Sequence, residues 1–263
     1  MEDGALIAVL ARQAGNVAHG IRLASGVPRD ARLRAGMRVR IDPERLSFDD
    51  ASIEVTLSTA RLWAPELRPG MCDQHGNSSD AALTVRKLLN RDAARSGSEF
   101  LAHVLRFKRT PTPLTVRVSA ILRRLGPAVR GGDCNGALNA VSQLIGLGPG
   151  LTPAGDDFIV GWLAGLTLLA KARPQCEFLH AICTGVEGLR FATTSVSSQH
   201  LDDASALLFS ERLSDLCVAI AVGASTRRLA SRVSAQLAVG ATSGADAAAG
   251  LMFALLNCGL IDR

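Results

Sequence analysis

The chain contains the stretch Gly146-Leu-Gly-Pro-Gly-Leu-Thr-Pro-Ala-Gly-Asp-Asp157, which is followed directly by an apolar run over residues 158–170. Four of these twelve residues are glycines and two are prolines, and glycines at that density let the backbone approach a ligand closely. The stretch predicts a helix start, with Thr152 as the N-cap and Pro153 at the first helical position. We expect the helix to run to about Arg173, where Pro174 ends it.

The chemistry of this helix start has two interpretations. Its free N–H groups and positive dipole end are suited to an anion, but Asp156 and Asp157 would repel one unless a cation such as Mg²⁺ lay between them. A purely structural turn is the alternative, because the dipole alone favours acidic residues in a first turn. The stretch lacks the lysine of a Walker A loop, and the expected helix before it excludes a Rossmann fingerprint.

A second stretch, Gly240-Ala-Thr-Ser-Gly-Ala-Asp246, repeats the pattern Gly-x-Thr-x-x-x-Asp and also precedes an apolar helix. This similarity aligns Asp246 with Asp156. Our hypothesis is that the two helix starts face each other and that the hydroxyl-rich run over residues 193–201 closes one side of the cleft. The alternatives are that Ser243 and Asp246 form an ordinary N-cap pair and that residues 193–201 form a solvated loop.

The bulk composition limits the class of protein. With 263 residues and 48% hydrophobic content, the chain can bury a large core in one or two domains. The net charge of +5 comes from scattered arginines, which weakly favours an acidic substrate and argues against nucleic acid. The six cysteines and five histidines show no zinc-ligand spacing. No apolar run is long enough to cross a membrane, and the acidic start lacks the basic region of a signal peptide, so we expect a cytoplasmic protein.

The fold class predicted is α+β, with a small N-terminal β-rich region over residues 1–75 and a mainly helical domain over residues 76–263. Alternating apolar residues predict strands at residues 37–41 and 53–57, and residues 71–79 are expected to form a polar loop. Helical spacing dominates thereafter, and the two glycine-rich stretches lie at helix N-termini. Besides the helix after Thr152, helices are expected at residues 136–145, 175–190, 205–208, 213–222, 226–237 and 246–256.

Three motifs occur in a fixed order: Gly-Leu-Gly-Pro-Gly-Leu-Thr-Pro-Ala-Gly-Asp-Asp-Phe, then residues 193–201, then Thr-Ser-Gly-Ala-Asp. Together they resemble a bacterial family associated with the small subunit of oxamate carbamoyltransferase, the AllH type. The first motif is a close and specific match. The third is looser, because Ala241 and Ala245 stand where the family often has bulkier residues. The resemblance covers roughly the last half of the chain.

The resemblance implies a carbamoyltransferase subunit that phosphorolyses oxalurate to oxamate and carbamoyl phosphate in anaerobic allantoin and purine catabolism. The implied partners are a small anionic substrate (phosphate, carbamoyl phosphate or oxalurate) and other subunits of a hetero-oligomeric enzyme. The alternative is a non-catalytic subunit that binds a metabolite or supports assembly while its partner chains perform the chemistry. A phosphotransfer enzyme using ATP is less favoured, because no P-loop is present.

The same resemblance assigns the site residues. It places Asp156 and Asp157 in catalysis, where either would bind a metal or orient the carbamoyl NH₂. It places substrate binding at Gly148, Gly150, Thr152, Gly155, Thr242, Ser243, Gly244 and Asp246. Backbone N–H groups of the glycine-rich loop would hold phosphate and offset its charge. Mg²⁺ is the cofactor considered, without named metal ligands, and no arginine can be assigned to an anionic substrate.

Overall fold

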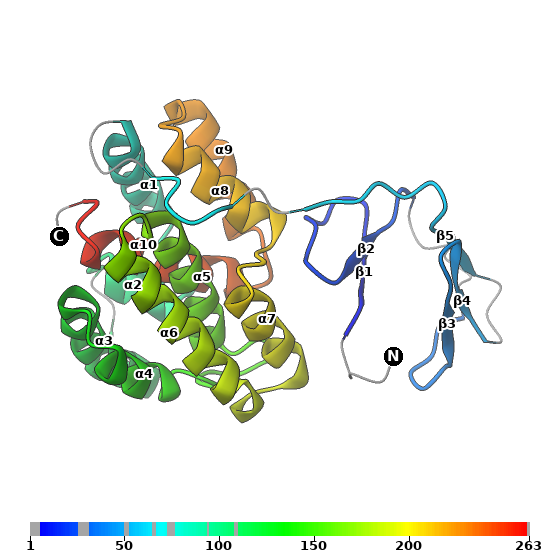
Figure 1. The fold of residues 1–263 in the computed structure, drawn as a ribbon, viewed down its shortest axis with the longest axis horizontal. Coiled ribbons are helices and arrows are strands. Elements are labelled where there is room, and N and C mark those ends of the chain that lie inside the picture. The colour runs from blue at the N-terminus through cyan, green and yellow to red at the C-terminus, as the bar shows by residue number, and fades with distance from the viewer. Residues whose placement is uncertain are drawn as a thin grey trace. The chain divides into compact units, whose positions relative to one another are not determined.

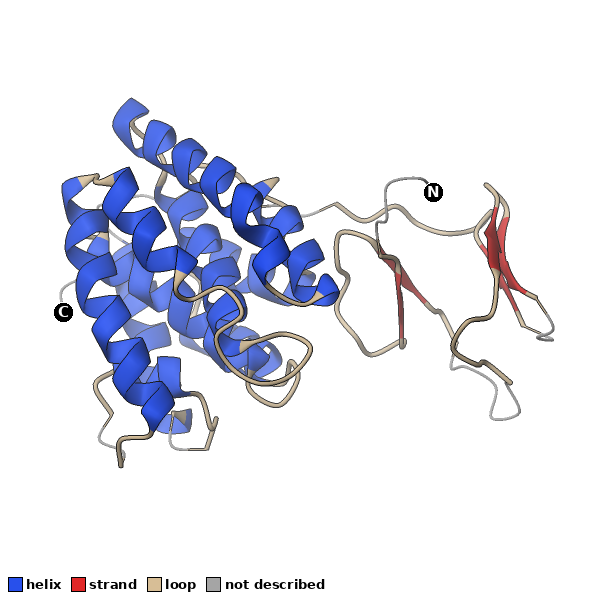
Figure 2. Ribbon diagram, turned by 90° about the horizontal axis from the view of Figure 1, so that it is seen from below, coloured by secondary structure: helices blue, strands red, loops and turns tan. Residues whose placement is uncertain are grey.

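The computed structural model describes residues 6–25, 32–49, 53–64, 67–72, 77–93, 95–107 and 110–261. The chain divides into two compact units, one spanning Leu6–Ala64 and the other containing the chain from Pro65 onward. Strands lie in the first unit and helices in the second (Figure 1, Figure 2). The α+β class predicted from the sequence is therefore confirmed.

The first unit consists of short strands. β1 (Ala8–Leu10) pairs in parallel with β2 (Gly20–Arg22), and β3 (Val39–Ile41), β4 (Arg45–Phe48) and β5 (Glu54–Thr56) form an antiparallel sheet in that order. The strands predicted at residues 37–41 and 53–57 are confirmed as the shorter β3 and β5. Among the described residues of this unit, Leu46 is the only apolar side chain that is fully buried.

The second unit is helical. It contains α1 (Asn77–Asp92), α2 (Glu99–Val104), α3 (Pro113–Gly131), α4 (Cys134–Ser142), α5 (Ala154–Leu169), α6 (Arg173–Leu189), α7 (Ser195–Ser205), α8 (Glu211–Ala221), α9 (Thr226–Leu237) and α10 (Ser243–Asn257), with a 3₁₀-helix, η1 (Arg190–Ala192), before α7. Ser98, Thr112, Asp133 and Thr194 cap α2, α3, α4 and α7 through their side chains. Hydroxyl and carboxylate oxygens at these positions accept hydrogen bonds from N–H groups that lack an intrahelical partner.

Several predicted boundaries are wrong. The loop expected at residues 71–79 includes the start of α1, while residues 73–76 lie outside the described residues. The helix that begins near Thr152 ends at Leu169 rather than near Arg173. Pro174, which was expected to end it, lies instead in the first turn of α6, where its missing N–H is tolerated.

The hydroxyl-rich run over residues 193–201 is mostly helix, not loop. Thr194 accepts a hydrogen bond from the Ser197 N–H at 3.1 Å and so starts α7, and the side chains of Ser197 and Leu201 are buried. Since α7 ends at Ser205, the helix predicted at residues 205–208 is also wrong. The hydroxyl-rich run therefore contains the N-cap and the first turns of a helix. Its polarity had favoured a loop, because Ser and Thr side chains often hydrogen-bond to the backbone outside helices.

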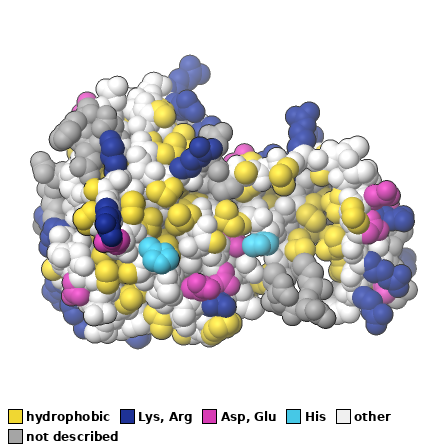
Figure 3. Space-filling view, in the orientation of Figure 1, with side chains coloured by type: hydrophobic (Ala, Val, Ile, Leu, Met, Phe, Trp, Pro, Cys, Tyr) yellow, Lys and Arg dark blue, Asp and Glu magenta, His cyan; other side chains and the backbone are white. Residues whose placement is uncertain are grey.

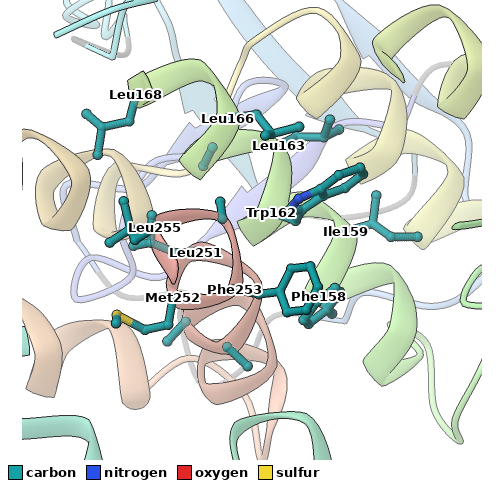
Figure 4. Close-up of a cluster of buried hydrophobic side chains, with 14 of the residues drawn as sticks. Phe158, Ile159, Trp162, Leu163, Leu166, Leu168, Leu251, Met252, Phe253 and Leu255 are labelled. Atoms are coloured by element: carbon teal, nitrogen blue, oxygen red, sulfur yellow. The ribbon is translucent and has the colours of Figure 1, made fainter. Parts of the chain in front are cut away.

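Helices α5 and α10 form the centre of the core. All but two residues of each helix are buried, which explains why both are apolar on every side. Figure 4 shows Phe158 of α5 beside Phe253 of α10. The Phe158 ring lies 4.9 Å from that of Phe100 in α2 and 5.5 Å from that of Phe253, measured between ring centroids.

Glycines allow α5 and α10 to touch through their backbones. A Cβ atom on Gly161 would collide with the carbonyl oxygen of Ala247, and one on Gly250 would collide with that of Phe158. Gly161 and Gly250 occupy the same position in their helices, counted from the N-caps Pro153 and Thr242. Thr152 contacts Ser243 at the starts of the two helices, and a Cβ atom on Gly165 would meet Ala254 near their ends. Helices α5 and α10 therefore run parallel with their N-termini side by side.

The helices around this pair form two related halves, α1–α5 and α6–α10. Helices α7 and α8 pack against α5 as α2 and α3 pack against α10. Helix α6 packs against α4 as α1 packs against α9, and α3 contacts α4 as α8 contacts α9. Each half therefore surrounds the central helix of the other half. This exchange is what places the two glycine-rich helix starts next to each other.

Candidate functional site

The first carboxylate at the start of α5 organises the loop before the helix. Asp156 is 1% exposed, and both of its oxygens are occupied. Its Oδ1 accepts the Gly146 N–H at 2.8 Å, and its Oδ2 accepts the hydroxyl of Thr193 at 2.5 Å. Asp156 thus ties the glycine-rich loop to the segment that precedes α7, so that this segment does lie against the loop, as the cleft hypothesis expected.

The second carboxylate at this helix start, Asp157, is in a different state. It is buried beside the hydroxyls of Thr152 and Ser243, yet its Oδ2 has no hydrogen-bond partner among the described residues. Burial raises the pKa of Asp157 to about 7, the two hydroxyls lower it, and the charges of Asp246 and Asp156 raise it. A carboxyl with this pKa exchanges its proton near neutral pH, which is the property of a general acid or base.

The carboxylate at the start of α10 resembles Asp157. The Oδ1 of Asp246 accepts the hydroxyl of Ser98 at 2.5 Å, and its Oδ2 has no partner among the described residues. Burial raises the pKa of Asp246 to about 6, the hydroxyls of Ser98 and Thr242 lower it, and Glu99 raises it. Ser98 also caps α2 through a hydrogen bond from the Leu101 N–H at 2.8 Å. One serine therefore positions both a helix and a carboxylate.

The structure corrects the alignment between the two helix starts. The sequence pattern aligns Asp246 with Asp156, but the backbone hydrogen bonds align it with Asp157. The carbonyl oxygen of Pro153 accepts from the N–H groups of Asp156 and Asp157, and that of Thr242 accepts from those of Ala245 and Asp246. Asp157 and Asp246 thus occupy the same helical position. They also share burial, a raised pKa and an unsatisfied oxygen.

The N-cap predicted for α5 is wrong, and the alternative of Ser243 as the N-cap of α10 does not hold either. Pro153, not Thr152, is the N-cap of α5, and Thr242, not Ser243, is the N-cap of α10. The hydroxyls of Thr152 and Ser243 instead hydrogen-bond to each other at 2.9 Å. This bond joins the two halves directly and confirms that the two helix starts face each other.

The four predicted glycines fall into two groups. Gly155 and Gly244 serve close packing, since a Cβ would strike the carbonyl oxygen of Leu144 in one case and of Gln236 in the other. Gly148 and Gly150 have φ angles of 119° and 99°, values that strain other residues. A Cβ on Gly148 would also crowd the Ala154 nitrogen at 2.9 Å, whereas nothing lies within 4 Å of a Cβ on Gly150.

The exposed part of the glycine-rich loop carries donors. Within the described residues, no acceptor is in hydrogen-bonding position for the N–H groups of Gly150, Leu151 and Thr152. The Gly155 N–H, in contrast, donates to the carbonyl oxygen of Leu147 at 2.8 Å. The N–H groups that could bind an anion therefore lie mainly in the loop before α5 and not in the first turn of the helix.

Two polar residues near Asp156 and Asp246 were not assigned from the sequence. His200 of α7 is half-buried, and its desolvation lowers its pKa, while the charges of Asp203 and Asp156 oppose that shift. Ser98, which contacts Asp246, lies 148 residues before it. A Ser-Glu pair before an apolar run does predict an N-cap, but no local pattern reveals a hydrogen bond over that separation.

The carboxylates do not form a ready metal cage. No group of three or more His, Cys, Asp or Glu side chains that could hold a metal occurs among the described residues, and two donors already occupy the oxygens of Asp156. We therefore derive no chemical step through a metal here. Mg²⁺ bridging to a substrate phosphate remains a prediction to be tested by titration.

The surface of the described residues agrees with the composition. Lysine and arginine side chains lie at separate places on the face shown in Figure 3 instead of forming one basic patch. In the part of the chain that the structure describes, no helix combines the length and the apolar character that crossing a membrane requires.

Fold and site together define a class: a helical protein in which two parallel, glycine-rich helix N-termini hold buried carboxylates with raised pKa values. Within this class, residues 144–255 match the family model described as oxamate carbamoyltransferase subunit AllH. The match agrees with the resemblance that the motifs indicate, over residues 144–255. It begins in the loop directly after α4, spans both helix starts, ends in α10, and covers less than half of the chain. No curated protein and no solved structure matches.

Proposed function

We propose that this chain is a subunit of a carbamoyltransferase of the oxamate carbamoyltransferase type. In the reaction, an oxygen of phosphate attacks the carbamoyl carbon of oxalurate and forms a C–O bond. The bond from that carbon to the imide nitrogen breaks, and the nitrogen leaves with oxamate. The proton that phosphate brings balances the one that the oxamate nitrogen takes up. We propose in addition that the chain acts in allantoin and purine catabolism and in the cytoplasm.

The observation that carries the proposal is the pair of equivalent carboxyls at adjacent helix N-termini. Asp157 and Asp246 have pKa values raised to about 7 and about 6 and one unsatisfied oxygen each. A protonated Asp157 is suited to deliver a proton to the leaving nitrogen, because a general acid works best with a pKa near the working pH. Asp246, with the lower pKa, is suited to accept a hydrogen bond from the carbamoyl NH₂.

The same region supports binding of the phosphate. Each helix N-terminus carries a partial positive charge of roughly half an elementary charge, and here two lie side by side. The N–H groups of Gly150, Leu151 and Thr152 add donors for an anion. Once Asp157 is protonated, the region loses one of the negative charges that would repel phosphate.

A second function, assembly with partner subunits, has its own support. Leu151 is 72% exposed and Phe191 is 77% exposed. They lie on neighbouring segments, since the Thr194 hydroxyl donates to the Leu151 carbonyl at 2.5 Å and Gly146 closely approaches the Ala192 carbonyl. Large apolar side chains exposed beside a polar site are typical of an interface. We propose that another subunit covers them and completes the site.

The decisive experiment measures carbamoyl phosphate formed from oxalurate and phosphate, with the chain alone and with the other subunits, with and without Mg²⁺. We expect Asp157→Asn to lower the rate by about 10²- to 10⁴-fold while the circular dichroism spectrum and assembly remain unchanged. Asp133→Asn is the matched control, because Asp133 caps α4 and Asn caps equally well. Full activity in Asp157→Asn would exclude its role as the acid.

The assembly function is tested separately. The double variant Leu151→Glu, Phe191→Glu should prevent co-elution with the other subunits in size-exclusion chromatography and leave the melting temperature unchanged. Val116→Glu is the control, since Val116 is 60% exposed on α3. Normal co-elution of the double variant would place the interface elsewhere. Activity of the isolated chain would show that partners are not required for chemistry.

A further inference from the structure

A cavity of about 290 Å³ lies in the helical unit, where α2 and α10 end and α3 passes. Its polar wall consists of Arg86, His103, Arg106, Arg123, Arg130 and Asn257. Leu122, Phe253 and Leu256 contribute to its apolar wall. The volume matches the lower end of the range for small-molecule sites.

The charge of this cavity is unbalanced. Four arginines line it and no aspartate or glutamate does. Within the described residues, neither Arg106 nor Arg123 forms an ion pair with a carboxylate. Arg106, Arg123 and Arg130 are exposed and Arg86 is half-buried. A hollow lined by charges of one sign focuses the electrostatic potential and raises the local concentration of ions of the opposite sign, so this arrangement favours an anion from outside the chain.

The side chain of Asn257 holds the guanidinium of Arg130 without neutralising it. The Arg130 guanidinium donates to Oδ1 of Asn257 at 2.5 Å, and the Asn257 amide donates to the Phe253 carbonyl at 2.8 Å. The Nδ1 of His103 lies 2.9 Å from the hydroxyl of Ser119. Burial, Arg123 and Arg106 all lower the pKa of His103, which reflects the same positive field.

Some of these arginines lie where they could also stabilise helix C-termini. Cationic side chains near helix C-termini are favoured by the dipole and by free carbonyls, and α2 and α10 both end here. Pro127 inside α3 also leaves the carbonyl of Arg123 without its usual helical donor. The C-termini of two helices nevertheless need fewer than four arginines. The apolar wall of the cavity, moreover, would not be needed if the arginines only capped helices.

We propose that this cavity is a second ligand site and that it binds a small phosphate ester, with the phosphate on the arginines and the organic part against Leu122, Phe253 and Leu256. Arginine is the side chain best suited to phosphate, because its planar donors bind two oxygens at once. The site goes beyond the proposed transferase function. Its four arginines lie outside residues 144–255, which match the family model.

The two sites lie at opposite ends of α10. Asp246 is in its first turn, and Asn257 is its last residue, which corresponds to a separation of roughly 16 Å along the helix axis. Helix α2 packs against α10, with its N-cap Ser98 bonded to Asp246 and with His103 of its last turn in the cavity wall. The two sites can therefore be tested independently with substitutions in only one of them.

The experiment is isothermal titration of the full chain with inorganic phosphate and with phenyl phosphate, at low and high salt. We expect phenyl phosphate to bind more tightly than phosphate, and each of Arg106→Gln and Arg123→Gln to weaken binding about tenfold, as for one charge-assisted hydrogen bond. Arg227→Gln is the matched control, because Arg227 lies exposed on α9.

Three results would overturn the proposal. One is the absence of phenyl phosphate binding at millimolar concentration by a chain that melts cooperatively. Another is an equal loss of affinity in Arg227→Gln, which would indicate only the general charge of the chain. The third is succinate binding as tightly as phenyl phosphate, which would contradict the phosphate class. Should a cavity variant unfold, crystallography of the unsubstituted chain with phenyl phosphate locates the ligand directly.

Discussion

The two helix starts of the central pair have the same geometry and different chemistry. Each has a glycine whose N–H donates back to a loop carbonyl, Gly155 to Leu147 and Gly244 to Val239. Each has a carboxyl in the same helical position, Asp157 and Asp246. Only the α5 half adds Asp156, which is hydrogen-bonded on both oxygens. A shared framework thus holds two buried carboxyls with raised pKa values, and one half adds a third carboxylate with both oxygens hydrogen-bonded.

The largest loss of stability should come from breaking the close backbone contact between α5 and α10. Gly161→Ala and Gly250→Ala each place a methyl group against a backbone carbonyl that cannot move aside. We expect a loss of more than about 3 kcal/mol in the free energy of unfolding, at the upper end for overpacked cores. Urea denaturation followed by circular dichroism measures it.

The matched control for this contact is Gly188→Ala in α6. Nothing lies within 4 Å of a Cβ at that position, so the substitution should stabilise the chain by about 0.5–1 kcal/mol. A similar loss at Gly188 and Gly161 would mean that helical glycines in general, and not the contact between α5 and α10, determine the result.

The next effect separates Asp157 from Asp156 by pH. The folded chain holds a proton on Asp157 up to about pH 7, whereas the unfolded chain releases it near pH 4. The folded state therefore binds more protons in this interval, and stability falls as pH rises from 4 to 7. In Asp157→Asn that decline should be smaller by roughly 3 kcal/mol.

Unfolding free energies at pH 4, 5.5 and 7 measure this effect. Since Asn is neutral at every pH, the variant should be more stable than the parent chain at pH 7, although we expect it to be inactive. An unchanged slope would show that Asp157 is ionised in the folded state.

A smaller effect should follow removal of the structural carboxylate. Asp156→Ala leaves the Gly146 N–H and the Thr193 hydroxyl without their acceptor, at a cost of about 2 kcal/mol. The pH slope should remain, because Asp157 is still present. Thermal melts at two pH values distinguish the two carboxylates, and a slope that disappears with Asp156 would reverse their roles.

The smallest effect concerns the hydroxyl bond between the halves. Thr152→Val and Ser243→Ala remove one partner each from the 2.9 Å contact. A double-mutant cycle should give a coupling energy of about 1 kcal/mol, as for one neutral hydrogen bond. A coupling energy of zero would show that the two hydroxyls bond to water rather than to each other.

Much of this arrangement could be predicted from the sequence. The glycine-rich stretches located both central helices, and their similarity indicated that they face each other. The register could not be predicted, because Gly-x-Thr-x-x-x-Asp aligns letters whereas hydrogen bonds to Pro153 and Thr242 determine helical position. The partner of Asp246, Ser98, could not be predicted either, since only the tertiary fold brings it close. The cavity arginines are scattered along the chain and converge only through packing.

The reciprocal glycine contact also bears on how the chain folds. Gly161 and Gly250 are about 90 residues apart, and closing so long a loop carries an entropy cost that no local contact offsets. Each half must cover the central helix of the other, so neither half has a complete core of its own. The α5–α10 pair should therefore form late and cooperatively. Until it does, the apolar faces of both helices are open to aggregation.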